Sequence, residues 1–233
     1  MARGGLAAVC TAFGFTLLRV WVHTVAAFGF EGSRSWDTLM LVAFRSRWGQ
    51  NWKVQIMASA VCMVAGAVTL GSRRFWPLAS LATAAFAASI PLLGHAAGNG
   101  PRMAVHVAHV LAAGVWLGSL AVVVAISDRQ TGAVILRRFA AVALPGAAIA
   151  VAAGLTATWL CVGNISGLWQ TGYGRVLVLK AALVGGVGVC GYTNWQRLRK
   201  QPESGASPVI GIEVALAIVV VIVTGYLTEI AHP

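Results

Sequence analysis

The stretch Leu92–Ser119, LLGHAAGNGPRMAVHVAHVLAAGVWLGS, decides how this chain folds. It carries His95, His106 and His109 within fifteen residues, next to a short polar turn and at the start of a strongly apolar run. That run, at about 103–126, is long enough for a helix that crosses a bilayer. An imidazole near hydrocarbon costs several kcal/mol unless it finds a partner. The stretch therefore predicts a membrane helix with a polar site at one end.

The rest of the chain has the same apolar character. Of its 233 residues 58% are apolar and 10% are charged, and the mean hydropathy is +0.80. Continuous apolar runs favour helices over the alternating strands of a barrel. We therefore expect an all-α integral membrane protein with one transmembrane domain, 1–233. Windows of about 20 residues predict seven spans, at about 5–29, 54–71, 75–94, 103–126, 139–161, 175–194 and 209–229.

The basic residues predict how the chain is oriented. With a cytoplasmic N-terminus, nine connector Lys and Arg residues face the cytoplasm and six face the outer side, a bias that follows the positive-inside rule. The net charge of +11 is thereby explained by basic residues in the connectors, which orient the chain and contact membrane lipid. Nucleic acid is therefore excluded as a partner. This orientation places every histidine toward the outer side, namely His23, His95, His106, His109 and His232. One-sided histidines indicate a shared outer site.

The outer connector 30–53 is the longest, and its central part mixes apolar and basic side chains. This pattern predicts an interfacial amphipathic helix or a re-entrant hairpin near 35–48. Anchoring in lipid and covering a site are both open roles for it. The connector also contains half of an internal repeat. Ser46-Arg-Trp-Gly49-Gln-Asn-Trp-Lys-Val-Gln55 resembles Thr171-Gly-Tyr-Gly174-Arg-Val-Leu-Val-Leu-Lys180, which predicts two related halves in parallel orientation.

The histidine stretch has the ligand chemistry of a copper site. On a helix, Met103, His106 and His109 are three residues apart, so that neighbours can share one ligand, and Trp116 returns to the same face. A thioether with imidazoles suits copper, whereas zinc more often adds thiolate or carboxylate. Carboxylates are scarce, with Glu229 near the outer end of the last span, which disfavours a hard cation.

The spans also contain ionisable residues and cysteines outside the histidine stretch. Lys180 either extends its ammonium to the outer interface or faces a functional cavity. Glu213 is expected near the inner end of the last span, at the interface. The four cysteines form no disulfide framework and are expected as buried thiols.

The chain resembles the copper resistance protein D (CopD) family of bacterial inner-membrane proteins over about 90–230. The resemblance is carried by Gly94-His95-Ala-Ala, His109-Val-Leu-Ala-Ala-Gly-Val-Trp116-Leu-Gly118, the Thr171–Lys180 segment and Asn194 before a basic turn. It implies a protein that accepts copper on the periplasmic side, beside a CopC-like donor, and transfers or imports it across the membrane. His95 and His109 match the family's positions. The candidates for an inner part of the path are Met57, Cys62 and Met63.

Two alternatives remain open at this stage. The first is a haem b electron-transfer protein, with His95 and either His109 or His23 as axial ligands. The second is a non-catalytic membrane subunit whose histidines hold helices together or sense pH. The sequence contains no nucleophile beside a base and no phosphate-binding loop, so we expect no enzyme.

Overall fold

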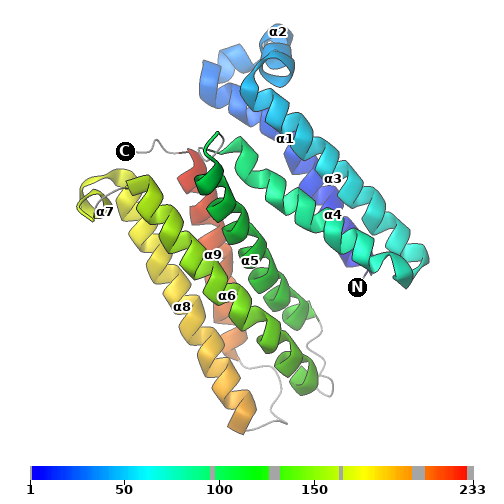
Figure 1. The fold of residues 1–233 in the computed structure, drawn as a ribbon, viewed down its shortest axis with the longest axis vertical. Helices are drawn as coiled ribbons and strands as arrows, with labels where there is room; N and C mark the ends of the chain where they lie inside the picture. The colour runs from blue at the N-terminus through cyan, green and yellow to red at the C-terminus, as the bar shows by residue number, and fades with distance from the viewer. Residues whose placement is uncertain (1, 95–97, 126–131, 163–164, 201–207, 230–233) are drawn as a thin grey trace. The chain divides into compact units, whose positions relative to one another are not determined.

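The structure is a computed structural model, and it describes residues 2–94, 98–125, 132–162, 165–200 and 208–229. Within these ranges the chain is helical and contains no strand, which confirms the predicted all-α class. The chain divides into two compact units, 1–110 (unit 1) and 111–233 (unit 2), each of which is described by itself (Figure 1).

Seven of the described helices are long and apolar enough to cross a membrane, as predicted. The chain is therefore a multi-pass membrane protein. The cytoplasmic N-terminus and the single transmembrane domain stay predictions. The seven segments are Gly4–Ser33, Arg47–Gly71, Arg73–Leu93, Gly100–Val123, Ala141–Val162, Gly172–Arg197 and Val209–Leu227.

Unit 1 is built on α3 (Arg47–Gly71), against which α1 (Ala2–Ser33) and α4 (Trp76–Ser89) both pack. A 3-10 turn, η2 (Arg73–Phe75), leads into α4, and a second, η3 (Ile90–Leu93), extends it. The buried residues of α3 recur every three or four positions and so occupy one face. They are Trp52, Gln55, Ser59, Cys62, Ala65 and Thr69.

Hydrogen bonds fasten α3 to both of its neighbours. The indole Nε1 of Trp52 donates to the Thr16 carbonyl of α1 at 2.7 Å. The Asn51 amide Nδ2 donates to the Leu92 carbonyl of η3 at 2.8 Å. Such bonds satisfy polar groups that lipid cannot satisfy, and so they fix how the three helices pack.

Between α1 and α3 lie two short helical segments, α2 (Trp36–Met40) and the π-helical η1 (Leu41–Arg45). Val42 and Ala43 are buried against the unit, whereas Trp36 and Phe44 are exposed, and the Lys53 ammonium lies 5.4 Å from the centre of the Phe44 ring. A buried apolar side and an exposed aromatic side agree with the predicted interfacial segment near 35–48.

Unit 2 contains the later part of α5 (Gly100–Ala125), then α6 (Gly132–Val162), the short α7 (Gly167–Gln170), α8 (Gly172–Lys200) and α9 (Pro208–Glu229). The hairpin of α8 and α9 is its main contact, and α7 packs on the start of α8 (Figure 1). A Cβ added at Gly146 of α6 would lie 3.3 Å from the Ala112 carbonyl of α5, so this glycine permits the two helices to approach closely.

The internal repeat of the sequence is also a structural repeat. Ser46 Oγ accepts a hydrogen bond from the Gly49 amide at 2.8 Å and donates to the Val42 carbonyl at 2.6 Å. Thr171 Oγ1 accepts from the Gly174 amide at 2.9 Å and donates to the Gly167 carbonyl at 2.7 Å. Each hydroxyl thus caps a long helix and ties it to the short helix before it. Matching residues are 125 positions apart, as 46 is from 171 and 49 from 174.

Candidate metal site

The start of α5 presents the predicted ligands in the predicted spacing. Asn99 caps the helix, because its Oδ1 accepts from the Arg102 amide at 3.1 Å. Gly98 precedes it with φ of 94°, a value that glycine adopts without strain. Met103, His106 and His109 follow, all half-buried and all helical. Neighbouring members of this set are therefore displaced by about 60° around the helix.

His95, the fourth residue of the predicted site on this stretch, lies outside the described residues, and so does His232. His106 and His109 each take part in an interaction with a neighbouring group. Within the described part of the chain, no three His, Cys, Asp or Glu side chains are grouped closely enough to hold a metal ion. The ligand set that joins His95 to His106 and His109 stays a prediction.

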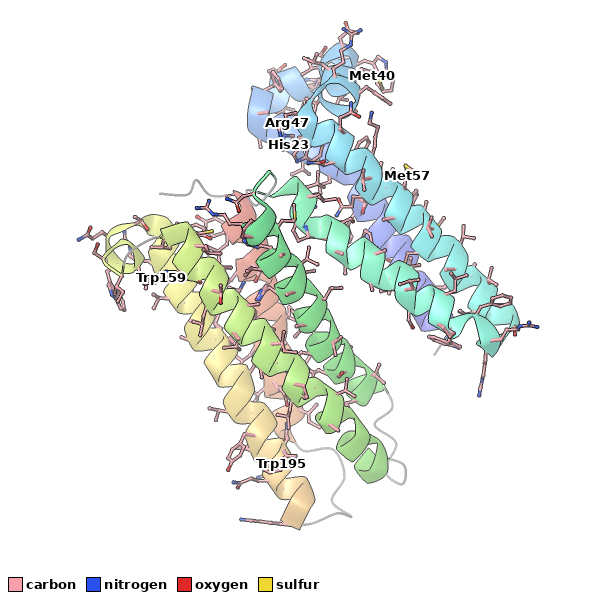
Figure 2. The ribbon with its side chains drawn as sticks, viewed as in Figure 1. His23, Met40, Arg47, Met57, Trp159 and Trp195 are labelled. Carbon is pink, nitrogen blue, oxygen red and sulfur yellow. The ribbon has the colours of Figure 1, made fainter. Side chains whose placement is uncertain are left out.

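His23 lies on α1, where its imidazole stacks on the Trp48 ring of α3. The ring centroids are 4.0 Å apart and the planes differ by 4°. Figure 2 labels His23 on α1. Trp48 stacks in turn on Trp52, with centroids 6.3 Å apart. Stacking occupies the faces of an imidazole, whereas its nitrogens bind in the plane of the ring. The stack thus orients His23 without using its coordinating atoms.

The residues predicted along a path through the membrane do not form one line on α3. Met57 is 67% exposed, while Cys62, five positions later, is 2% exposed, with its Sγ 3.3 Å from the Thr83 hydroxyl of α4. Met63 is half-buried. Met57 and Cys62 therefore lie on different sides of the helix (Figure 2 labels Met57), because five residues correspond to about 140° of rotation.

Lys180 and Gln55 occupy matching positions of the two repeats, each six residues after the repeat glycine. In unit 1 the Gln55 amide is buried, and its Oε1 accepts from Arg19 Nη1 at 3.3 Å. The Arg19 guanidinium inside the first span thus has a polar partner on α3, as intramembrane charges require. In unit 2 Lys180 is half-buried in α8, and Trp116 is half-buried in α5.

Glu213 was expected near the inner end of the last span, and the structure adds a partner for it on the facing helix. The Glu213 side chain is buried between α8 and α9, where its Oε2 accepts a 2.7 Å hydrogen bond from Asn194 Nδ2. Asn194 belongs to the predicted family resemblance, which assigns it no role. The signal that could have indicated the pair is Gly191, one turn before Asn194, because a small residue there leaves room for a large one on the facing helix.

Comparison with known proteins points to one family. The family model described as Copper resistance protein D matches residues 133–227. This range includes Lys180, Asn194 and Glu213, but it contains none of the candidate ligands on α5. Copper transport protein CutJ of Bacillus subtilis (strain 168) is 26% identical over 132 residues, which cover 54% of this chain and 24% of that protein. This chain thus matches about a quarter of the length of CutJ. No solved structure matches the chain.

Both matches and the seven spans agree on a multi-pass protein of the bacterial inner membrane. The residues of the predicted resemblance in α8, the Thr171–Lys180 segment and Asn194, lie within the matched range. Over residues 133–227 the chain is therefore similar to the copper resistance protein D family.

Proposed function

We propose that this protein binds copper near the outer ends of its helices and transfers it across the inner membrane toward the cytoplasm. The observation that carries the proposal is the placement of Met103, His106 and His109 on consecutive turns at the start of α5. A thioether with imidazoles is a donor set suited to copper in either oxidation state. The family and the printed name of CutJ support the same metal.

The proposed ligands come from three parts of the chain. Met103, His106 and His109 lie on α5 and are half-buried, so an ion bound there is shielded from bulk water. His95 precedes α5 by five residues in the sequence, and we propose that it contributes to the same site. His23, held by its Trp48 stack, is the candidate from α1. The copper ion is cargo in this account, and the chain is not an enzyme.

Copper reaches the outer side from a donor, for which a CopC-like periplasmic protein is the proposed partner. The further path includes Met57, Cys62 and Met63 on α3, with Trp116 and Lys180 beside the site or along the path. Because Met57 and Cys62 are on different sides of α3, we propose that they act at successive stages and do not share one ion.

The test is the copper stoichiometry of the purified protein in lipid nanodiscs, measured after gel filtration. We expect bound copper in the parent and its loss in the His95→Ala, His109→Ala double variant. Met103→Leu should weaken binding, whereas the control Met40→Leu, a methionine of α2 outside the proposed site, should not. Undiminished copper in the double variant would place the site elsewhere, and a strong Soret absorbance band would instead identify haem.

A further inference from the structure

The hairpin of α8 and α9 holds a buried carboxyl group beside a buried amide. Asn194 is 6% exposed and Glu213 is 8% exposed, and the amide Nδ2 donates to Glu213 Oε2 at 2.7 Å. Gly191 makes room for the other carboxyl oxygen, because a Cβ at this position would lie 3.2 Å from Oε1. Both residues lie inside spans, where an ionisable group is costly and usually functional.

The pair has one unfilled hydrogen-bonding position. Asn194 Oδ1 is buried and has no hydrogen-bond donor among the described residues. An ionised carboxylate only accepts hydrogen bonds and cannot supply a donor. A protonated carboxyl group can, because its hydroxyl donates to the amide oxygen while its carbonyl accepts from the amide nitrogen. The acid form of Glu213 is thus able to supply the donor that Asn194 Oδ1 lacks among the described residues.

Unit 1 shows how the matching helix position is packed without this pair, because a Cβ added at Gly66 would lie 3.8 Å from the Leu6 side chain of α1. By the repeat offset, Gly66 matches Gly191 and Thr69 matches Asn194. Thr69 Oγ1 donates to the Gly66 carbonyl of its own helix at 2.6 Å, so its hydroxyl group needs no hydrogen-bond partner on another helix. Close packing of two helices at this position therefore does not require a carboxyl group and an amide. The pair in unit 2 calls for a reason other than packing.

The chemistry of the pair favours a proton over a metal ion. Asn194 Oδ1 and Glu213 Oε1 are two oxygens, whereas calcium and magnesium take about six or more ligands. Copper prefers nitrogen and sulfur. On α8 the titratable neighbours in sequence are Cys190, Tyr192 and Arg197, and among the described side chains Asn194 is the one that hydrogen-bonds the Glu213 carboxyl. A carboxylate without a cationic partner in a span favours its neutral form.

We propose that Glu213 takes up and releases one proton at the end of the α8–α9 hairpin, and that Asn194 positions the acid form. The proton comes from water and returns to it. Asn194 is six residues from Lys200, the last residue of α8, so the pair is about 9 Å from that helix end along the axis. Trp195, its neighbour, marks the end of α8 away from α7 (Figure 2). The predicted orientation places this end on the cytoplasmic side.

Coupling of this proton to copper transfer rests on the proposed function, whereas the proton site itself does not. With one proton bound for each copper released, Glu213 would make the transfer rate depend on cytoplasmic pH. The copper ligands proposed on α5 are separate residues, so a change at Glu213 should leave copper binding intact.

The test is infrared difference spectroscopy of the full chain in nanodiscs during a pH titration. We expect a carbonyl band of a buried carboxylic acid that disappears in Glu213→Gln and persists in the control Glu31→Gln, a carboxyl that is exposed. Glutamine keeps an acceptor for Asn194 Nδ2, so the variant should fold. Asn194→Thr introduces the residue that unit 1 has at the matching position. It should shift the band because the carboxyl hydroxyl of Glu213 loses its amide acceptor.

The proposal is overturned if the parent band is unchanged in Glu213→Gln, or if Asn194→Thr leaves its frequency unaltered. In proteoliposomes, Glu213→Gln should bind copper like the parent but lose the pH dependence of copper transfer. If the parent binds no copper while the band titrates, the proposed function fails and the proton site stands. If the parent binds copper and no Glu213 band exists, the proton site fails and the copper proposal stands.

Discussion

Gly49 and Gly174 occupy the same position in two copies of one helix-start motif. A Cβ at Gly49 would collide with the Val42 and Ala43 carbonyl oxygens, and a Cβ at Gly174 would collide with the Gly167 carbonyl oxygen. In each case the glycine lets a short helix lie across the start of a long one. The equivalence shows that units 1 and 2 share a local architecture, whatever their arrangement in the membrane.

Alanine at either glycine should therefore destabilise the protein. We expect Gly49→Ala and Gly174→Ala each to cost about 1–3 kcal/mol, because backbone atoms must move to admit the methyl group. The measurement is the unfolding midpoint in detergent. Gly188→Ala, on α8 with open space around its Cβ, is the matched control and should be neutral or slightly stabilising. Equal midpoints for all three variants would contradict the account of the motif.

The indole hydrogen bond between α3 and α1 should contribute measurably to stability. Trp52→Phe keeps an aromatic ring in the cluster but removes the Nε1 donor to the Thr16 carbonyl. Interhelical bonds of this kind contribute about 0.6 kcal/mol on average in membrane proteins and at most about 1.7. We expect a loss in that range by reversible unfolding. Trp159→Phe, at an exposed indole of α6, should produce no loss.

The His23 stack separates a structural role from a ligand role. His23→Phe retains a ring for Trp48 to stack on and removes both coordinating nitrogens. We expect the copper dissociation constant to rise, measured by competition with a copper chelator, while the ring at this position still stacks on Trp48. An unchanged dissociation constant would assign His23 to the aromatic stack alone.

The predicted orientation can be tested with single cysteines in a variant that lacks the four native ones. We expect Ser35→Cys, exposed before α2, to react with a membrane-impermeant maleimide added to intact spheroplasts. Arg73→Cys, exposed in the connector between α3 and α4, should react only after lysis. The reverse pattern would invert the topology and place every histidine on the cytoplasmic side.

The sequence predicted the spans because length and apolarity are local properties of a segment. The interfacial segment and the repeat were likewise predictable, since amphipathic pattern and glycine spacing are written in short windows. The partners of buried groups were not. Asn194 and Glu213 are nineteen residues apart on different helices, and their contact depends on which faces of α8 and α9 meet. The His23–Trp48 stack was not predictable for the same reason, because the sequence around one residue does not identify the other as its partner.

The copper ligands remain a prediction from spacing and family. Residues Met103, His106 and His109 lie on consecutive helical turns, as a helix requires, but their convergence with His95 depends on residues outside those that the structure describes. Periodicity can place side chains on one helix. It cannot bring a second element to them.

The most direct measurement of the central claim is copper K-edge X-ray absorption on the copper-loaded protein in nanodiscs. The account predicts a shell of imidazole nitrogens with one sulfur, in which Met103→Leu removes the sulfur scatterer and His106→Ala reduces the imidazole contribution. The control Met40→Leu should leave the spectrum unchanged. A shell of oxygen ligands, or a spectrum that neither Met103→Leu nor His106→Ala alters, would contradict copper binding at the start of α5.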